Sequence, residues 1–573
     1  MNLQLRAILL IFFPLAVACT APEPDADLVL QNGRIVTVDS QRPEVEALAI
    51  QGELIVAAGS LSEVEARIGP QTRILDLNGA LAIPGFIEGH GHFMGVGEAK
   101  RQLDLNQADS WEEIVEMVRE AVQAAQPGEW ILGRGWHQEK WRPAPEPSFQ
   151  GLPYHDSLSR ASPDNPVLLT HASGHASFAN LMAMELAGIT DDTPDPPGGA
   201  IVRDEEGRAI GAFRETAQDF VGRALALDES LQSPEQRRRA MQEIVRLSTE
   251  ECLANGITSF QDAGSSFETI DFLKELAENG QLGVRLYVMI RESNQRLAEK
   301  MAGYRLIGLA DDFLTVRAVK LSIDGALGSH GAWLLEPYSD LPESAGHNTV
   351  DIETARETAR LCMENGFQLC IHAIGDRANR ETLDLFERVF KERPDEGDLR
   401  WRIEHAQHLH PDDIGRFAGL RVIASIQGIH ATSDGPWVES RLGAERAREG
   451  AYVWRSLAES GALIVNGTDA PVEDVSPIQS YYASVTRRML DGREFYPEQR
   501  MSRELALRTY TLNAAYATFE ERLKGSLEAG KLADVVVLDR DILTVPEDEI
   551  LEAKVLYTIL GGKIVYTNPA AIR

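Results

Sequence analysis

The sequence predicts an α/β protein in which a (β/α)8 TIM barrel with an inserted subdomain is joined to a β-sandwich built from both chain termini. Three observations predict this fold. Eight short apolar runs, each followed by a helical pattern, occupy the middle of the chain, as is typical of a (β/α)8 barrel. Short β-rich segments lie at both chain ends. The first two apolar runs are separated by far more sequence than one helical crossover needs.

Residues 1–18 are predicted to be a signal peptide of the lipoprotein type. Arg6 precedes an apolar stretch, residues 7–18, that is too short to span a bilayer as a stable helix. The sequence LAVAC at residues 15–19 resembles a bacterial lipobox, in which the cysteine is lipidated. We therefore expect lipidation at Cys19, a tether over residues 19–26, and anchoring at the periplasmic side of the outer membrane. A plain periplasmic or extracellular protein is the alternative.

Residues 27–82 and 526–573 are predicted to form the composite β-sandwich. Two β-rich runs within residues 27–38 flank Asn32-Gly33, a dipeptide that predicts a hairpin. Further hairpins are expected at residues 47–58 and 555–566. Because β segments at the two ends enclose a long α/β region, one sandwich assembled from both termini is expected.

Residues 83–525 are predicted to form the barrel. Its expected strands are residues 81–87, 257–261, 284–290, 314–323, 367–371, 399–403, 422–426 and 463–465. The interval between the first two strands, about residues 100–250, is expected to be the inserted subdomain. A helix at residues 234–255 is expected to close it.

Composition and charge limit the classes of partner. At 573 residues the chain is too long for one hydrophobic core. Its formal net charge of -32 argues against nucleic acid or an anionic membrane surface, because phosphate binding needs concentrated Lys and Arg. Membrane contact is therefore expected through the lipid anchor only, and a homo-oligomer is left open. The odd number and irregular spacing of Cys252, Cys362 and Cys370 predict buried free thiols.

Metal-ligating side chains are concentrated where the predicted barrel strands end. His90 and His92 lie two residues apart, so on an extended chain both imidazoles can face one point. The further candidates, at the ends of later runs or inside the fourth, are Lys320, His372, His405 and Asp469. A single strand-end histidine is more often a satisfied polar residue than a ligand. The conjunction of these residues on one eight-run pattern predicts a centre for a divalent metal.

Several longer motifs surround these candidates. They are residues 84–92 (PGFIEGHGH), 133–136 (GRGW), 324–329 (DGALGS), 372–378 (HAIGDRA), 403–407 (IEHAQ), 430–434 (HATSD) and 525–534 (GSLEAGKLAD). With these motifs the chain resembles the amidohydrolase superfamily, specifically its amidohydrolase family 3 branch, over close to its full length. Jointly the motifs are specific for the superfamily, but they say little about the substrate.

The resemblance implies a hydrolase that uses one or two divalent metal ions, for which zinc is the expected element. The implied ligands are His90, His92, Lys320, His372, His405 and Asp469. Lys320, carboxylated by carbon dioxide, would bridge two ions, which agrees with the tendency of a buried lysine to lose its proton. Because such an ion supplies activated water near neutral pH, Asp469 is expected to accept the water proton and deliver it to the leaving nitrogen.

The predicted function is hydrolysis of a non-peptide C–N bond in an N-acyl or N-formyl amide of a small molecule. The candidates for substrate binding are Trp136, His175, Asp324 and His330, with His137, Arg214 and Trp437 in segments that could also line the barrel mouth. His175 is the best of these because Gly174 lets the backbone approach a ligand closely. Two alternatives remain open: a ring deaminase on the same metal site, and a catalytically dead, lipid-anchored binding protein, against which the retained ligand set argues.

Overall fold

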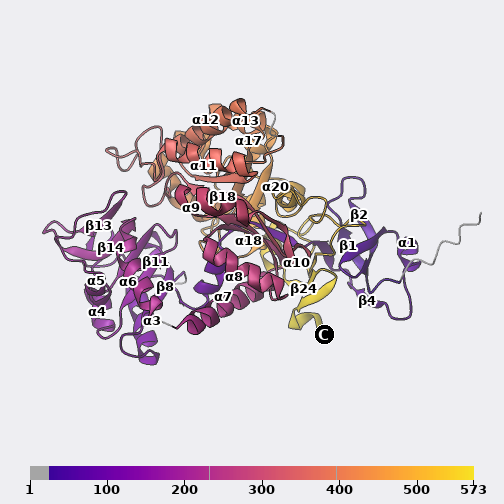
Figure 1. Ribbon diagram of the computed structural model, residues 1–573, viewed down its shortest axis with the longest axis horizontal. Helices are drawn as coiled ribbons and strands as arrows, with labels where there is room; N and C mark the ends of the chain where they lie inside the picture. Colours follow the sequence, from indigo (N-terminus) through magenta and orange to yellow (C-terminus); the bar gives the residue numbers. More distant parts are fainter. Residues whose placement is uncertain (1–24, 107, 232, 395–396, 573) are drawn as a thin grey trace, which may run out of the picture.

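The computed structural model describes residues 25–106, 108–231, 233–394 and 397–572 (Figure 1). The predicted signal peptide and Cys19 lie outside these residues. Within the described ranges, no helix combines the length and the apolar content needed to cross a membrane. The molecule has three parts: a central barrel, the purple lobe at the left of Figure 1, and a β-rich part at the right that contains the indigo N-terminal strands.

The central part is the predicted barrel, built from eight parallel strands that follow one another in chain order. The strands are β6 (Phe86–Gly91), β15 (Ile257–Ser265), β16 (Arg285–Ile290), β18 (Leu314–Ser322), β19 (Gln368–Ala373), β20 (Arg402–His405), β21 (Ile423–Gln427) and β22 (Ile464–Gly467). The last strand returns beside the first, where the Asp469 amide donates to the His90 carbonyl (2.8 Å). The polar ends of β6 and β22 therefore meet at the barrel mouth.

Helices cover the outside of the barrel, which explains why strands such as β16 are buried along their whole length. The long helix predicted at residues 234–255 is confirmed as α7, which begins after a capping box formed by Ser233 and Gln236. The helices of this part are α2 (Phe93–Ala99), α7 (Pro234–Ala254), α8 (Phe267–Glu278), α9 (Asn294–Lys300), α10 (Leu309–Asp312), α11 (Ile352–Asn365), α12 (Asp376–Glu392), α13 (Pro411–Leu420), α14 (His430–Ser433), α15 (Gly435–Leu442), α16 (Ala444–Gly450), α17 (Trp454–Glu459), α18 (Pro477–Thr486), α19 (Arg503–Thr509) and α20 (Leu512–Ala517).

The prediction of one strand over residues 81–87 is wrong, because the run divides into two strands at Gly85. β5 (Leu81–Pro84) pairs with the C-terminal strand β23, whereas β6 begins at Phe86 and pairs with β15. A Cβ atom at Gly85 would lie 2.3 Å from the Thr258 hydroxyl, so only glycine fits at the crossing point. Both strands are buried throughout, and an uninterrupted apolar run therefore hides the boundary between them.

Strands from both chain ends form one further sheet, in the order β25-β24-β23-β5-β1-β2-β3, with β4 beside β1. These strands are β1 (Leu28–Val36), β2 (Glu44–Gln51), β3 (Leu54–Gly59), β4 (Arg73–Asp76), β5 (Leu81–Pro84), β23 (Val535–Leu538), β24 (Val555–Leu560) and β25 (Lys563–Thr567). A short helix, α1 (Leu61–Glu65), follows β3. Apolar side chains from strands of both ends share one core, which includes Leu30, Ile50 and Val537.

The hairpin predicted at Asn32-Gly33 is wrong, whereas the hairpins at residues 47–58 and 555–566 are confirmed as β2–β3 and β24–β25. β1 continues past Asn32 on the same partner strand, with a bulge in the register between Gln31 and Ile35. Asn32 adopts a left-handed conformation (φ 62°) inside this bulge. A turn-forming dipeptide thus serves here as an insertion within one strand.

The purple lobe is inserted between β6 and β15 and has a sheet of its own, in the order β13-β14-β12-β11-β8-β7 (Figure 1). Its strands are β7 (Leu103–Asp104), β8 (Ile131–Trp136), β11 (Val167–His171), β12 (Ala176–Ala179), β13 (Gly199–Arg203) and β14 (Ala209–Glu215). Its helices are α3 (Trp111–Ala124), α4 (Asp156–Ala161), α5 (Leu181–Leu186) and α6 (Gln218–Ser230). Its apolar clusters are separate from the barrel core, and Arg134 of β8 reaches the barrel by donating to the Pro471 carbonyl (3.1 Å).

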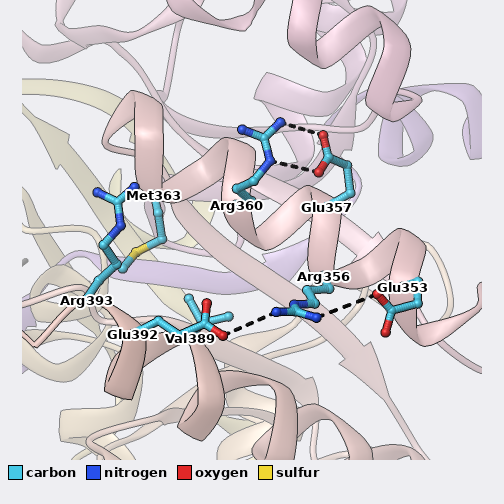
Figure 2. Close-up of a pocket in the computed structure, with 8 residues that line it drawn as sticks. All are labelled: Glu353, Arg356, Glu357, Arg360, Met363, Val389, Glu392 and Arg393. Atoms are coloured by element: carbon cyan, nitrogen blue, oxygen red, sulfur yellow. Dashed lines mark hydrogen bonds and ion pairs between the residues drawn. The ribbon is translucent and has the colours of Figure 1, made fainter.

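A groove of about 320 Å³ lies between α11 and α12 on the helical outside of the barrel (Figure 2). The residues that line it are Glu353, Arg356, Glu357, Arg360, Met363, Val389, Glu392 and Arg393. Its charges pair within the groove, as between Arg360 and Glu357 and between Arg356 and Glu392. Because these side chains come from helices and not from strand ends, the groove is separate from the barrel mouth.

Candidate metal centre

The barrel mouth brings the six predicted ligands into one cluster, in which all are buried except the half-buried His92. The carboxylate Oδ1 of Asp469 lies 3.3 Å from His92 Nε2 and 3.5 Å from His90 Nε2. The other histidine rings adjoin this pair, with centroids 4.8 Å apart for His90 and His405 and 4.4 Å apart for His405 and His372. Lys320 reaches the same point from the inside of β18, where its Nζ lies 3.4 Å from His90 Nε2.

Backbone geometry at the ends of β20 and β22 helps to place this cluster. His405 and Asp469 both adopt positive φ angles, 75° and 58°, which are uncommon for residues with side chains. Beside Asp469, a Cβ atom at Gly467 would lie 2.4 Å from the Glu88 carboxylate. Glu88 itself accepts from the Thr468 amide (2.6 Å) and thereby joins β6 to β22. Strained backbone held by surrounding contacts is typical of functional sites.

A buried ion pair orients His90. The Nδ1 atom of His90 donates to Glu404 Oε2 (2.5 Å), and the other oxygen of Glu404 lies 2.7 Å from Arg402 Nε, with all three side chains fully buried. Burial alone would raise the pKa of Glu404, but Arg402 and His90 hold it well below its usual range. The proton of His90 is thereby fixed on Nδ1, which leaves Nε2 to face the cluster, as in metal-binding histidines.

His405 is oriented in the same way by a neutral acceptor. Its Nδ1 lies 2.7 Å from Gln427 Oε1 at the end of β21, so its Nε2 also faces the cluster. Sequence reasoning quoted Glu404 within a motif but assigned no role to Glu404, Arg402 or Gln427. The available signal was a charged Arg-x-Glu pair directly before His405, in the short buried strand Arg402–His405.

The electrostatics of the cluster favour a bound cation. Burial lowers the pKa of His90 to about 4 and holds the pKa values of His372 and His405 well below the usual value, so these imidazoles are neutral near pH 7. Burial also lowers the pKa of Lys320 to about 8. Burial would raise the pKa of Asp469, but the adjacent His92 side chain, with its Nε2 3.3 Å from Oδ1, contributes most to holding that pKa well below its usual range.

The donor set fits a divalent transition metal. Among the described residues, the buried atoms His372 Nε2, His430 Nε2 and Asp469 Oδ1 have no hydrogen-bond partner. Two groups of three side chains, one of His90, His92 and Asp469 and the other of His405, His430 and Asp469, each place their ligand atoms within 4.8 Å of one another. Nitrogen-rich sites with one carboxylate suit zinc and its neighbours.

His430 was missed as a candidate from sequence, although it begins the HATSD motif. It lies 6% exposed at the start of α14, on the loop that follows β21. Its ring is nearly parallel to that of His405, at 11° and with centroids 6.4 Å apart. Sequence reasoning attended to residues that end a strand, whereas His430 follows the end of β21 by three positions.

Two of the four substrate-binding candidates lie beside the cluster. His175, from the inserted lobe, has its ring centroid 6.1 Å from that of His372, and its Nδ1 pairs with Glu215 Oε2 (2.8 Å). Asp324 lies 3.4 Å from His372 Nε2, but its oxygens accept from the amides of Trp333, Ile374 and Gly375. Asp324 therefore ties the loop after β18 to the loop after β19.

The other two candidates point elsewhere. Trp136 is 1% exposed in the core of the inserted lobe, where its indole donates to the Leu169 carbonyl. His330 pairs with Asp340 (3.1 Å) on the loop after β18 and packs on Tyr338. Of the remaining mouth residues, His137 lies near Trp437, with ring centroids 6.5 Å apart, and Arg214 donates to Gln150 within the inserted lobe.

A (β/α)8 barrel with neutral imidazoles and a carboxylate converging at its strand ends places this protein in the class of metal-dependent barrel enzymes. Comparison with known proteins narrows the class. The sequence model of the Amidohydrolase family matches residues 73–566, and the chain belongs to this family. Structural neighbours of the chain include metal-dependent hydrolases, which supports a hydrolase.

Relatives match over nearly the whole chain. Protein LONG AFTER FAR-RED 3 of Arabidopsis thaliana is 34% identical and covers 94% of this chain and 92% of its own length. N-substituted formamide deformylase of Arthrobacter pascens is 27% identical and covers 94% and 98%. An uncharacterized metal-dependent hydrolase of Pyrococcus horikoshii has a similar structure, with a TM-score of 0.73, 26% identity, and coverage of 91% of this chain and 99% of its own.

Proposed function

We propose that the protein hydrolyses a non-peptide C–N bond in an N-acyl or N-formyl amide of a small molecule. The observation that carries this proposal is Asp469: its Oδ1 is buried and has no hydrogen-bond partner among the described residues, and the residue belongs to both groups of candidate ligands. A carboxylate so placed can take a proton from water and return it to a leaving nitrogen. The name of the Arthrobacter relative, an N-substituted formamide deformylase, supports the choice of bond.

In the proposed site, His90, His92 and Asp469 would hold one divalent ion, His372 and His405 would hold a second where two are present, and zinc is the element proposed. Lys320, carboxylated on Nζ, would bridge the two. A bound divalent ion would supply Lewis-acid polarisation of the carbonyl and a lower pKa for water. Asp469 accepts the proton as oxygen adds to the acyl carbon. It then protonates the nitrogen as the C–N bond breaks, and a carboxylic acid and an amine leave.

The inserted lobe supports a compact, enclosed substrate. It brings His175 to within 6.1 Å of His372 (ring centroids), and its Arg134 donates to the carbonyl of Pro471, two residues beyond Asp469.

Arg291 directly follows β16 and lies beside β18, with its guanidinium 3.4 Å from Ser322 Oγ. A cation at this rim favours amides that also carry a carboxylate, such as N-acyl amino acids.

Ring deamination on the same site is not favoured. Matches to adenine deaminases are local: one from Carboxydothermus hydrogenoformans is 38% identical but covers 13% of this chain. A catalytically dead binding protein is not favoured either, because all six predicted ligands are present and adjoin one another. His92 adjoins Asp469, Lys320 adjoins His90, and the ring of His405 adjoins those of His90 and His372.

The test is a substrate panel for the metal-loaded enzyme: N-formyl amines, N-acyl amino acids, cyclic imides, esters and aminopyrimidines. Amide cleavage that stops on chelation and returns on adding zinc is the expected result. Ester cleavage with no amide cleaved would contradict the choice of bond, and ammonia release from aminopyrimidines alone would favour a deaminase.

Export and anchoring through Cys19 are also part of the proposal. Cys19→Ala is expected to move the protein from the membrane fraction to the soluble fraction, which cell fractionation would show. A wild-type protein found soluble, with its N-terminus elsewhere than Cys19, would favour plain secretion.

A further inference from the structure

We infer that His430 contacts the substrate and donates a hydrogen bond from Nε2 to the carbonyl oxygen of the acyl group that is cleaved. This inference deepens the proposed function and rests on it in one respect, that the substrate carries a carbonyl at the reacting carbon. Nothing in the family match assigns a role to His430.

The backbone around His430 is held rigidly. The Gly428 amide donates to Asn466 Oδ1 (2.8 Å) and the Ile429 amide donates to Ser480 Oγ (3.2 Å), so β22 and α18 both hold the segment that leads into α14. A Cβ atom at Gly428 would lie 2.1 Å from Ser484 Oγ, which leaves no room for another residue. The imidazole of His430 is therefore presented at a fixed point.

The Nδ1 atom of His430 accepts a hydrogen bond from a side-chain amide. Gln407 Nε2 lies 3.1 Å from His430 Nδ1 and donates to it, which makes Nδ1 an acceptor and leaves the proton on Nε2. The ligand histidines have the opposite arrangement: Nδ1 of His90 faces the Glu404 carboxylate, and Nδ1 of His405 faces Gln427 Oε1. Their Nε2 atoms carry lone pairs, whereas that of His430 carries a hydrogen.

The other nitrogen faces the cluster. A ring nitrogen of His430 lies within 4.8 Å of ligand atoms of His405 and Asp469. Because Gln407 occupies Nδ1, the nitrogen free to act is Nε2, which is buried without a hydrogen-bond partner among the described residues. A buried N–H left unpaired costs free energy, which a ligand that accepts a hydrogen bond would recover. The site thus has an acceptor, Asp469, and a donor, His430, on neighbouring sides of one small space.

An acceptor (Asp469) and a donor (His430) beside the same small space suit the addition of water to an acyl carbon. As the new C–O bond forms, the electron pair of the carbonyl bond moves onto the carbonyl oxygen, which gains negative charge. A fixed N–H in a buried site stabilises that charge, and its removal typically lowers kcat by about 100-fold to 1000-fold. When the pair returns, the C–N bond breaks and Asp469 supplies the proton to nitrogen.

The experiment compares metal-loaded His430→Ala, His430→Gln and Gln407→Glu with wild type. Ser433→Ala is the matched control, because Ser433 lies on the same α14 turn and its hydroxyl is unpartnered among the described residues. His405→Ala is the control for ligand loss. The measurements are kcat and KM on every carbonyl substrate that wild type cleaves, bound metal by mass spectrometry, and the melting temperature.

His430→Ala is expected to keep its metal and lose about 100-fold in kcat. His430→Gln should recover part of the loss, because a glutamine amide can place an N–H near the position of Nε2. Gln407→Glu should also lower kcat, because a carboxylate accepts from Nδ1 and draws the proton away from Nε2.

Metal loss in His430→Ala equal to that in His405→Ala would overturn the inference and make His430 a ligand. A kcat within threefold of wild type would overturn it as well. If wild type cleaves esters and no amides, the proposed bond is wrong, but a loss of ester turnover in His430→Ala still supports the inference. Turnover only of ring substrates that lack a carbonyl at the reacting carbon would overturn both.

Discussion

His90 Nδ1 lies 2.5 Å from Glu404 Oε2, a contact between residues 314 positions apart in the chain. Both side chains are fully buried, and Arg402 balances the charge of the carboxylate. The contact does two things: it ties the first barrel strand to the sixth, and it fixes which nitrogen of His90 faces Asp469. The same carboxylate therefore contributes to stability and to the proposed metal site.

Glu404→Leu is expected to destabilise the fold by about 3–5 kcal/mol, because it leaves the Arg402 guanidinium buried without its counter-ion. Adding Arg402→Met should restore much of the stability but not the metal affinity, which should be about 10-fold to 100-fold weaker. Urea unfolding and metal titration measure the two effects. The control is Glu357→Ala at the exposed pair with Arg360, expected to cost about 1 kcal/mol or less. Equal costs at the two sites would contradict the account.

His90→Ala together with His92→Ala should abolish metal binding, because the pair contributes two of the three side chains in the group that includes Asp469. Metal analysis of the purified protein checks this. His347→Ala, a change at an exposed histidine that belongs to neither ligand group, is the matched control and should bind metal normally. Wild-type protein that stays metal-free in zinc-supplemented medium would speak against the site.

Lys320→Ala should lose activity, with partial rescue by short carboxylic acids that refill the position of the carboxylated side chain. The lowered pKa of Lys320, about 8 through burial, raises the share of neutral amine that can capture carbon dioxide. Growth with ¹³C-labelled bicarbonate should give a carbamate carbon signal that the variant lacks. Unmodified Lys320 beside a filled metal site at high resolution would rule out the bridge.

Acid should destabilise the fold partly through His408, which is 2% exposed and whose ring nitrogens have no hydrogen-bond partner among the described residues. Burial lowers its pKa from 6.5 to about 3. Between these values the unfolded chain binds a proton that the folded chain does not, so this share of stability is present above pH 6.5 and is lost as pH falls toward 3.

Between pH 6.5 and pH 3, the contribution of His408 to the free energy of unfolding should fall by about 1.4 kcal/mol per pH unit. The loss is roughly 2 kcal/mol between pH 6.5 and pH 5. His408→Leu should therefore lose less stability than wild type on going from pH 7.5 to pH 5, as measured by urea unfolding. If the free energy of unfolding depends on pH identically in the two proteins, His408 takes up its proton in the folded state as readily as in the unfolded chain.

Much of the barrel could be predicted from sequence because parallel strands covered by helices are apolar along their whole length, as β16 is. The same property hid the division at Gly85, since β5 and β6 are both fully buried and differ only in their partners. At Asn32 the local turn preference was overridden by continued pairing of β1 with β2. Pairing partners depend on distant strands, which no local pattern contains.

Only part of the candidate site, too, could be predicted from the sequence. Histidines that end a strand, such as His372, could be identified by position alone. His430, Gln427 and Arg402 could not, because their roles depend on contacts with His405 and Glu404 across neighbouring strands. Trp136 shows the opposite error. Its motif predicted substrate binding, but its indole donates to the Leu169 carbonyl inside the inserted lobe.

The most direct test of metal-dependent amide hydrolysis at this cluster is amine release from an N-formyl or N-acyl amide by wild type and by Asp469→Asn. Both proteins are assayed after metal loading and again after chelation. We expect turnover by loaded wild type only, with a loss of at least about 1000-fold in Asp469→Asn, because in the proposed mechanism this carboxylate would both hold the ion and move the proton. Turnover by Asp469→Asn within tenfold of wild type, or by chelated wild type, would contradict the account.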